Sequence, residues 1–198
     1  MSGILTNNLG RAGGLMKAPA AGHLTLLESQ LTGSGTPTEM TFNTNIESHF
    51  DTYDELRFQF GGFNPSALES LVLQWSADDF STINNTAHGV RSVSENGEEQ
   101  QIASTASMES PLQTKTTYQV SGMIDGVVVI HCGKGNGTGY ATFETVVVAQ
   151  TADSGLRTTS NWGFHSGGQA IDALRFAWSG GGTFADDGWV KFVGIDYG

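Results

Sequence analysis

The residues best suited to catalysis or metal binding are few and scattered in this 198-residue chain. The histidines lie at positions 23, 49, 88, 131 and 165, without the His-x-x-x-His or His-Glu-x-x-His spacing that holds a metal. His131 and Cys132 are adjacent, but such a pair is more typical of a strand end than of a catalytic dyad. No G-x-S-x-G motif marks a serine nucleophile. We therefore predict no catalytic residue, no metal ligand and no cofactor, and hence a protein that is not an enzyme.

Two other segments carry residues of a suitable type. The sequence GKGNGTG at 133–139 contains a lysine, but it lacks the Gly-Lys-Ser/Thr ending of a phosphate-binding loop, and we interpret it as a hairpin loop. Acidic pairs occur at 78–79, 98–99 and 186–187. Glycoside hydrolysis needs two carboxylates at a defined separation across a cleft, and no spacing here indicates one.

The segment SADDFSTI at 76–83 resembles the Asp-box turn, S-x-D-x-G-x-T-W, with Phe80 in place of the glycine and Ile83 in place of the tryptophan. In such turns the serine and the aspartate satisfy backbone groups of a hairpin, which is a structural task. A calcium ion held by these loops is the alternative.

One cluster of aromatic residues falls outside the strand pattern. Trp162, Phe164 and His165 lie in NWGFHSGG, which we interpret as a loop. An exposed aromatic loop can stack on sugar rings or dock into another protein, so these three are candidate receptor or partner contacts. The alternative is a loop that folds its aromatics over the end of the domain. Trp75 and Trp178 lie on apolar strand faces and are assigned to the core.

Alternation of apolar and polar residues predicts about eight strands. In ELRFQF, at 55–60, every second residue is apolar, as in a strand with one wet side. The other strands are expected at 23–30, 71–75, 118–125, 127–132, 140–150, 173–179 and 189–196, with Asp125-Gly126 as a hairpin turn and Val146–Val148 buried on both faces. The polar stretch at 84–115 is predicted to be a long excursion with one or two weak strands. No helix is expected beyond one turn at Ser66–Leu71.

These elements predict an all-β protein: an antiparallel jelly-roll-like β-sandwich over residues 21–198, with an extended N-terminal arm over residues 1–20. The arm intersperses apolar residues with glycine and proline, so it cannot bury them by itself. It is either a frayed end or an arm that docks on a neighbour. Its candidate assembly contacts are Ile4, Leu5, Leu9, Leu15 and Met16.

Composition excludes several classes. The chain has 20 Asp+Glu and 9 Lys+Arg, a net charge of -11 at pH 7, which argues against a nucleic-acid partner. No apolar run approaches the ~20 residues of a membrane span. No charged start followed by an apolar block indicates a signal peptide. The single cysteine excludes an internal disulfide framework.

Three segments resemble the β-sandwich, tail-fibre-like structural proteins of tailed bacteriophages. The sequences are TYDELRFQFGGFNP, LVLQWSADDFST and QAIDALRFAWSGGGTFADDGWVKFVGIDYG, joined by YQVSGMIDGVVVI. The matching positions are Tyr53-Asp54, Arg57, Ser76–Thr82, Ile171-Asp172, Leu174-Arg175-Phe176, Ser179-Gly180, Gly188 and Gly194-Ile195. LTNNLGRAGGLMKA, in the arm, resembles the start of some phage fibre-like proteins. Trp189 departs from the family, which has a smaller residue there.

The resemblance implies a virion structural protein, made in the cytoplasm of a bacterial host and placed in a tail fibre, tail tip or baseplate. It implies a homo-oligomer, with a trimer favoured, anchored to other virion proteins by the arm and able to contact a host-surface glycan or protein. One alternative is a decoration (cement) protein that stabilises the capsid. Another, from a different class, is a carbohydrate-binding module.

Overall fold

The structure of the protein is a computed structural model. It describes residues 23–33, 36–66, 69–81, 87–95, 98–108, 112–113, 123–132, 141–150, 156–165, 171–184 and 188–198. The predicted arm contacts Ile4, Leu5, Leu9, Leu15 and Met16 lie outside these residues, as does the glycine-rich segment at 133–139.

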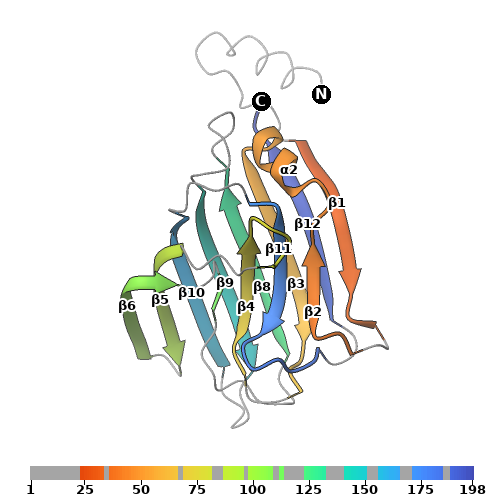
Figure 1. The fold of residues 1–198 in the computed structure, drawn as a ribbon. Coiled ribbons are helices and arrows are strands. Elements are labelled where there is room, and N and C mark those ends of the chain that lie inside the picture. Colours follow the sequence, from red (N-terminus) through yellow and green to blue (C-terminus); the bar gives the residue numbers. More distant parts are fainter. Residues whose placement is uncertain are drawn as a thin grey trace, which may run out of the picture.

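Twelve strands and one short helix make up the described residues (Figure 1). The strands are β1 (His23–Leu31), β2 (Glu39–Phe42), β3 (Glu55–Phe63), β4 (Leu71–Ser76), β5 (Ala87–Glu95), β6 (Glu98–Met108), β7 (Leu112–Gln113), β8 (Ile124–His131), β9 (Thr142–Gln150), β10 (Leu156–His165), β11 (Ala173–Trp178) and β12 (Trp189–Asp196). The helix is α2 (Ile46–Thr52).

The strands form two antiparallel sheets, and their order confirms the jelly-roll prediction. The large sheet runs β1-β12-β3-β8-β9-β10-β5-β6, and the small sheet runs β2-β11-β4-β7. Without β5, β6, β9 and β10, the remaining eight strands form two four-stranded sheets, β1-β12-β3-β8 and β2-β11-β4-β7. The chain passes between them in the sequence of a double Greek key. The additional strands β9, β10, β5 and β6 widen the large sheet on its β8 side (Figure 1), and β9 still faces the small sheet, since Phe143 meets Trp75 of β4 edge-on at 5.9 Å.

The core lies between the two sheets and is rich in aromatic rings. Phe58 and Phe192 of the large sheet stack with centroids 4.4 Å apart. Phe42 and Phe176 of the small sheet meet Phe58 edge-on at 5.1 and 5.6 Å. Trp75 and Trp178 are buried, which confirms their assignment to the core. In β11, and in β3 up to the irregularity between Phe60 and Phe63, the inward positions are every second residue, so the alternation seen in the sequence is the alternation of the two faces of the strand.

Several local predictions are wrong. Asp125 and Gly126 form no hairpin turn, because both lie inside β8. Glycine is required at 126 by packing: a Cβ there would lie 2.7 Å from the Phe60 ring and 2.8 Å from the Val146 carbonyl oxygen. Val146 and Val148 are not buried on both faces, since only Val147 points into the core. The stretch at 84–115 does contain strands, as predicted, but two of them are long: β5 and β6, of 9 and 11 residues, lie at the edge of the large sheet, and the two-residue β7 pairs with β4 in the small sheet.

The helix was also missed. In α2, Ile46 and Phe50 are buried and lie one turn apart, so they share a face that packs on the core. Two apolar positions in seven residues are too few to show a helical period. In the predicted turn at Ser66–Leu71, Leu71 instead begins β4. No helix in the described ranges is long and apolar enough to cross a membrane.

Candidate functional site

The candidate contact residues lie in a strand, so their assignment to a loop is wrong. Trp162 and Phe164 belong to β10, and His165 is its last residue. β10 is paired on both sides, with Trp162 opposite Glu144 of β9 and Val90 of β5. These residues are therefore held at fixed positions on the large sheet.

The structure brings Trp162 and Phe164 together with two valines on the outer face of the large sheet, the face turned away from the small sheet. Trp162 is 43% exposed and Phe164 49%, and Val146 and Val148 of β9 are 45% and 36% exposed. Val146 is a diagonal neighbour of Trp162, within reach of its ring. We call these four residues the outer patch. The exposed carboxylate of Glu144 stands opposite Trp162 within it.

The inward residues of β10 explain why the strand was missed. Thr159 and Asn161 point into the sandwich and are fully buried. The Asn161 amide nitrogen donates to Thr145 Oγ1 at 2.7 Å. The hydrophobic pattern of β10 is thus the reverse of that in the other strands, with polar residues inside and aromatics outside. The alternation of Trp162, Gly163 and Phe164, with an aromatic residue at every second position, was the one feature of the sequence that indicated a strand here.

The turn after β4 has the hydrogen bonds expected of an Asp box. The Ser76 hydroxyl donates to Asp78 Oδ1 at 2.8 Å and accepts from the backbone N–H groups of Asp78 and Phe80 at 3.1 and 2.9 Å. The Asp172 carboxylate accepts from the Asp79 N–H at 3.2 Å. These carboxylates therefore fix the turn. No group of three His, Cys, Asp or Glu side chains in the described part of the chain is arranged to hold a metal.

Phe80 stands in this turn where the Asp box has glycine, and its φ is 62°, in the left-handed region. The Arg175 guanidinium carbon lies 4.2 Å from the centroid of its ring. We expect Phe80→Ala to lower the free energy of unfolding, because it keeps the strained φ and loses this contact, worth about 0.5–1 kcal/mol. Phe80→Gly should be about 1 kcal/mol more stable than Phe80→Ala. Urea unfolding of the two variants checks this, and a less stable glycine variant would contradict it.

A polar cluster at one end of β3 holds a buried carboxylate. Glu55 accepts from Arg57 Nε at 2.9 Å and from the Tyr197 hydroxyl at 2.7 Å, and the His131 imidazole lies 4.0 Å away. Burial raises the pKa of the adjacent Cys132 thiol to about 12. The thiol therefore stays protonated near neutral pH, so the pair His131-Cys132 has no thiolate nucleophile.

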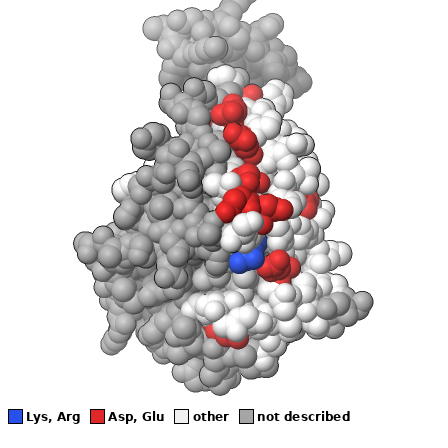
Figure 2. Space-filling view, viewed as in Figure 1, with Lys and Arg blue, Asp and Glu red and all other residues white. Residues whose placement is uncertain are grey.

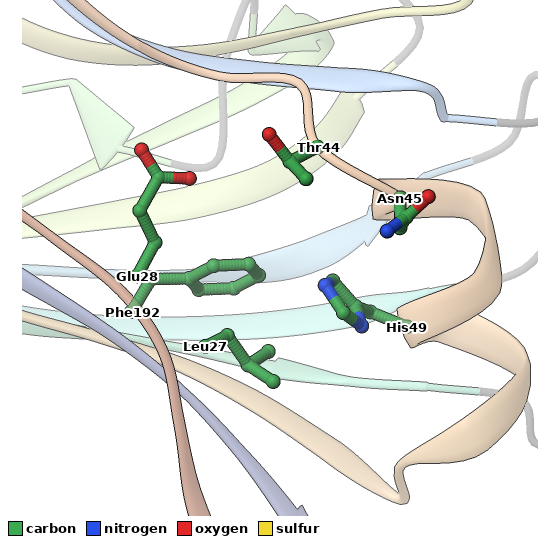
Figure 3. A pocket seen from close by; sticks show the side chains of 6 residues that line it. All are labelled: Leu27, Glu28, Thr44, Asn45, His49 and Phe192. Atoms are coloured by element: carbon green, nitrogen blue, oxygen red, sulfur yellow. The ribbon is translucent and has the colours of Figure 1, made fainter.

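A cavity of about 240 Å³ opens between strands β1 and β12 of the large sheet and residues 44–49, which lead from β2 into α2 (Figure 3). Phe192, Leu27 and His49 form its apolar part, and Glu28, Thr44 and Asn45 contribute polar groups. The volume is below the ~300 Å³ at which typical ligand pockets begin. One oxygen of Glu28 already accepts from the Gln30 amide at 2.7 Å. The cavity can take one side chain or a small organic group.

His49 in this cavity gives the fold a dependence on pH. Burial lowers the pKa of His49 below its usual 6.5, and its ring packs edge-on against Phe192 at 5.8 Å. His49 therefore binds a proton more readily in the unfolded chain than in the folded protein. The contribution of His49 to the free energy of unfolding is complete above pH 6.5 and is lost as the pH falls toward and through the lower pKa of the folded state. Free energies of unfolding of the wild type and of His49→Gln at pH 7.5 and 5 check this. The variant should lose less stability on acidification, and equal losses would contradict the assignment.

Charge is distributed unevenly over the surface. On the side from which Figure 2 is viewed, where the small sheet lies in front, acidic side chains follow a band down the described part of the molecule. A pair on the small sheet, Arg175 Nη1 and Glu39 Oε2, is 2.8 Å apart. The outer patch lies on the opposite side of the sandwich.

The strand order places this chain in the class of antiparallel jelly-roll β-sandwiches. No family model matches the sequence, and no curated protein is similar to it. Among solved structures, an aerolysin-like protein of Bombina maxima is 8% identical over 78% of this chain and 88% of its own, with a TM-score of 0.11. At that TM-score the likeness supports no inference about fold or function.

Proposed function

We propose that the protein is a structural component of a bacteriophage particle, present as a homotrimer in a tail fibre, tail tip or baseplate. Residues 1–20 attach it to neighbouring virion subunits, and it acts by binding, with no turnover of a substrate. The host surface is a further partner, through a glycan or a protein.

The outer patch is the observation that carries this proposal. It places two aromatic and two β-branched side chains, each at least about a third exposed, in a diagonal row across β10 and β9, in the order Phe164, Trp162, Val146 and Val148. Contiguous apolar areas on a soluble protein mark contact sites. Aromatic rings are also the side chains that contribute most to binding energy. This patch is well suited to repeated assembly contacts, because β10 is paired with a strand on each side and so presents the same rigid surface in every copy.

The segments that resemble phage proteins support the proposal by meeting in space. Tyr53 of the first segment packs against Gly194 of the last, where a Cβ would lie 2.6 Å from the ring. The Asp172 N–H donates to the Ser76 carbonyl at 2.8 Å, which joins the second and last segments. The last segment thus contacts both of the other two.

Incorporation into particles tests the proposal. Two phage variants are needed. One encodes the chain without residues 2–20, and the other encodes the full-length chain with serine in place of Ile4, Leu5, Leu9, Leu15 and Met16. We expect both changes to lower the amount of the protein in purified particles at least roughly tenfold, because burial of five large apolar side chains contributes several kcal/mol. Quantitative mass spectrometry of the particles measures this. Unchanged incorporation would refute the role of the arm.

Exposure of Trp162 favours a second candidate, a carbohydrate-binding module. An exposed indole on a sheet can stack on a sugar ring. In that case the purified protein binds an oligosaccharide and Trp162→Ala abolishes binding, whereas Leu31→Ala, a change at a residue 77% exposed in β1, leaves it intact. A capsid decoration protein remains a further alternative and is separated by copy number, which would then be in the hundreds per particle.

A further inference from the structure

The outer patch combines apolar surface with negative charge, from Glu144 of β9 and from Asp125 of β8, which lies opposite Val148. Val146, Val148, Trp162 and Phe164 supply the apolar surface, and Glu144 lies opposite Trp162 in the β9–β10 pairing. A complementary ligand would present several large apolar side chains and a positive charge in an extended segment.

Residues 1–20 have that chemistry. They contain five large apolar residues, two basic residues, Arg11 and Lys17, and no acidic residue. Their net charge is +2, whereas residues 21–198 hold seven basic and twenty acidic residues, a net charge of −13. The arm is the cationic and apolar part of an otherwise acidic protein.

We propose that the outer patch is the docking site for residues 1–20 of a neighbouring copy of the chain. Apolar side chains of that arm cover the four patch residues, and Arg11 or Lys17 meets Glu144. This inference rests on the homo-oligomer of the proposed function, and it identifies the two surfaces that join the copies.

The arm can reach an outer patch on its own chain or on a neighbouring copy. The arm enters β1 at one edge of the large sheet, and β10 lies five strand spacings away, about 24 Å. Twenty residues span up to about 70 Å, so length is sufficient for either route. The homo-oligomer of the proposed function selects the neighbouring copy, and the cross-linking experiment below distinguishes the two routes. A donor at one edge and an acceptor toward the other give a head-to-tail contact, which closes into a ring when three copies are related by a threefold rotation, as in the proposed homotrimer.

Charge also favours the arm over direct contact between two sheets. Two patches placed face to face would bring together two Glu144 side chains and two bodies of net charge −13 each. The exposed area of four side chains is also smaller than the ~800 Å² per partner that a stable interface buries. An extended arm adds buried area while it brings opposite charges together.

Cross-linking between co-expressed chains tests the proposal. One chain carries Leu9→Cys and the other, marked by an affinity tag, carries Val146→Cys. The native Cys132 thiol does not compete, because burial raises its pKa to about 12. We expect the Leu9→Cys chain to form roughly tenfold more disulfide with Val146→Cys than with the control Leu31→Cys, since docking raises the local concentration. Leu31 is 77% exposed in β1, away from the patch. Equal disulfide yields with Val146→Cys and Leu31→Cys would overturn the proposal. A single chain that carries both Leu9→Cys and Val146→Cys serves as a further control, and a disulfide that forms within this chain but not between chains would also overturn it.

Charge exchange provides the second arm of the test. Glu144→Lys should weaken self-association of the full-length protein roughly tenfold, and Asp51→Lys, the same charge change on α2, should have little effect. Adding Arg11→Glu and Lys17→Glu to Glu144→Lys should restore association. Sedimentation velocity measures all three, and absence of restoration would overturn the pairing. If the protein is a virion component whose arm docks elsewhere, cross-linking and charge exchange will both give negative results, but deletion of the arm will still lower incorporation into particles. The docking proposal and the proposed function can therefore fail independently.

Discussion

Phe58→Ala is expected to lower the free energy of unfolding by about 3–5 kcal/mol. The Phe58 side chain is fully buried and touches rings from both sheets: Phe192 beside it, and Phe42 and Phe176 across the core. Its removal leaves a cavity where the two sheets meet, which neighbouring rings cannot fill without leaving their own contacts. Equilibrium unfolding in urea measures the loss.

Phe164→Ala is the matched control, because it deletes the same side chain from the outer patch, where 49% of it is exposed. We expect it to cost less than about 1 kcal/mol. If Phe58→Ala leaves too little folded protein, Phe58→Leu should still cost about 1–1.5 kcal/mol. Equal effects at positions 58 and 164 would contradict a core between the sheets.

Gly194→Ala should cost about 2–3 kcal/mol, through overcrowding rather than a cavity. A Cβ at this position would lie 2.6 to 2.7 Å from three atoms of the Tyr53 ring, closer than atoms can pack. The backbone here cannot yield easily, because β12 is paired on both sides and the Asp54 N–H donates to the Ile195 carbonyl at 3.0 Å.

A double-mutant cycle with Tyr53→Ala identifies the cause. If the ring is what the new methyl group strikes, Gly194→Ala should cost almost nothing in the background of Tyr53→Ala, and the coupling free energy should match the cost in the wild type. Additive effects would show that glycine is needed at 194 for another reason.

The fold was predictable wherever apolar residues alternate strictly. β3, with Leu56, Phe58 and Phe60 inward, and β11, with Leu174, Phe176 and Trp178 inward, were found from the sequence, because one wet and one dry face impose this pattern. β2 is only four residues long and follows a turn-rich segment, so its two inward residues gave too little signal. The Asp125-Gly126 pair looked like a turn because Asp-Gly is a common hairpin dipeptide. Glycine is needed there for another reason, its packing against Phe60, which is far away in the sequence and could not be foreseen from it.

Two of the four residues of the outer patch were singled out from the sequence, but the strand that carries them was not. Trp162 and Phe164 drew attention because they are aromatic in a polar context, and that context is the inward pair Thr159 and Asn161. Only the pairing of β10 with β9 brings in Val146 and Val148, which sequence reasoning had placed in the core. An all-valine run gives no indication of which residues face the core, so the outer patch could not be assembled from the sequence.

Electron cryomicroscopy of purified particles tests the virion role most directly. We expect jelly-roll density in symmetric, repeated copies at the tail, with a connection that leaves the β1 edge of each sandwich and reaches the outer face of the next. Particles of full infectivity that contain none of this protein would contradict it.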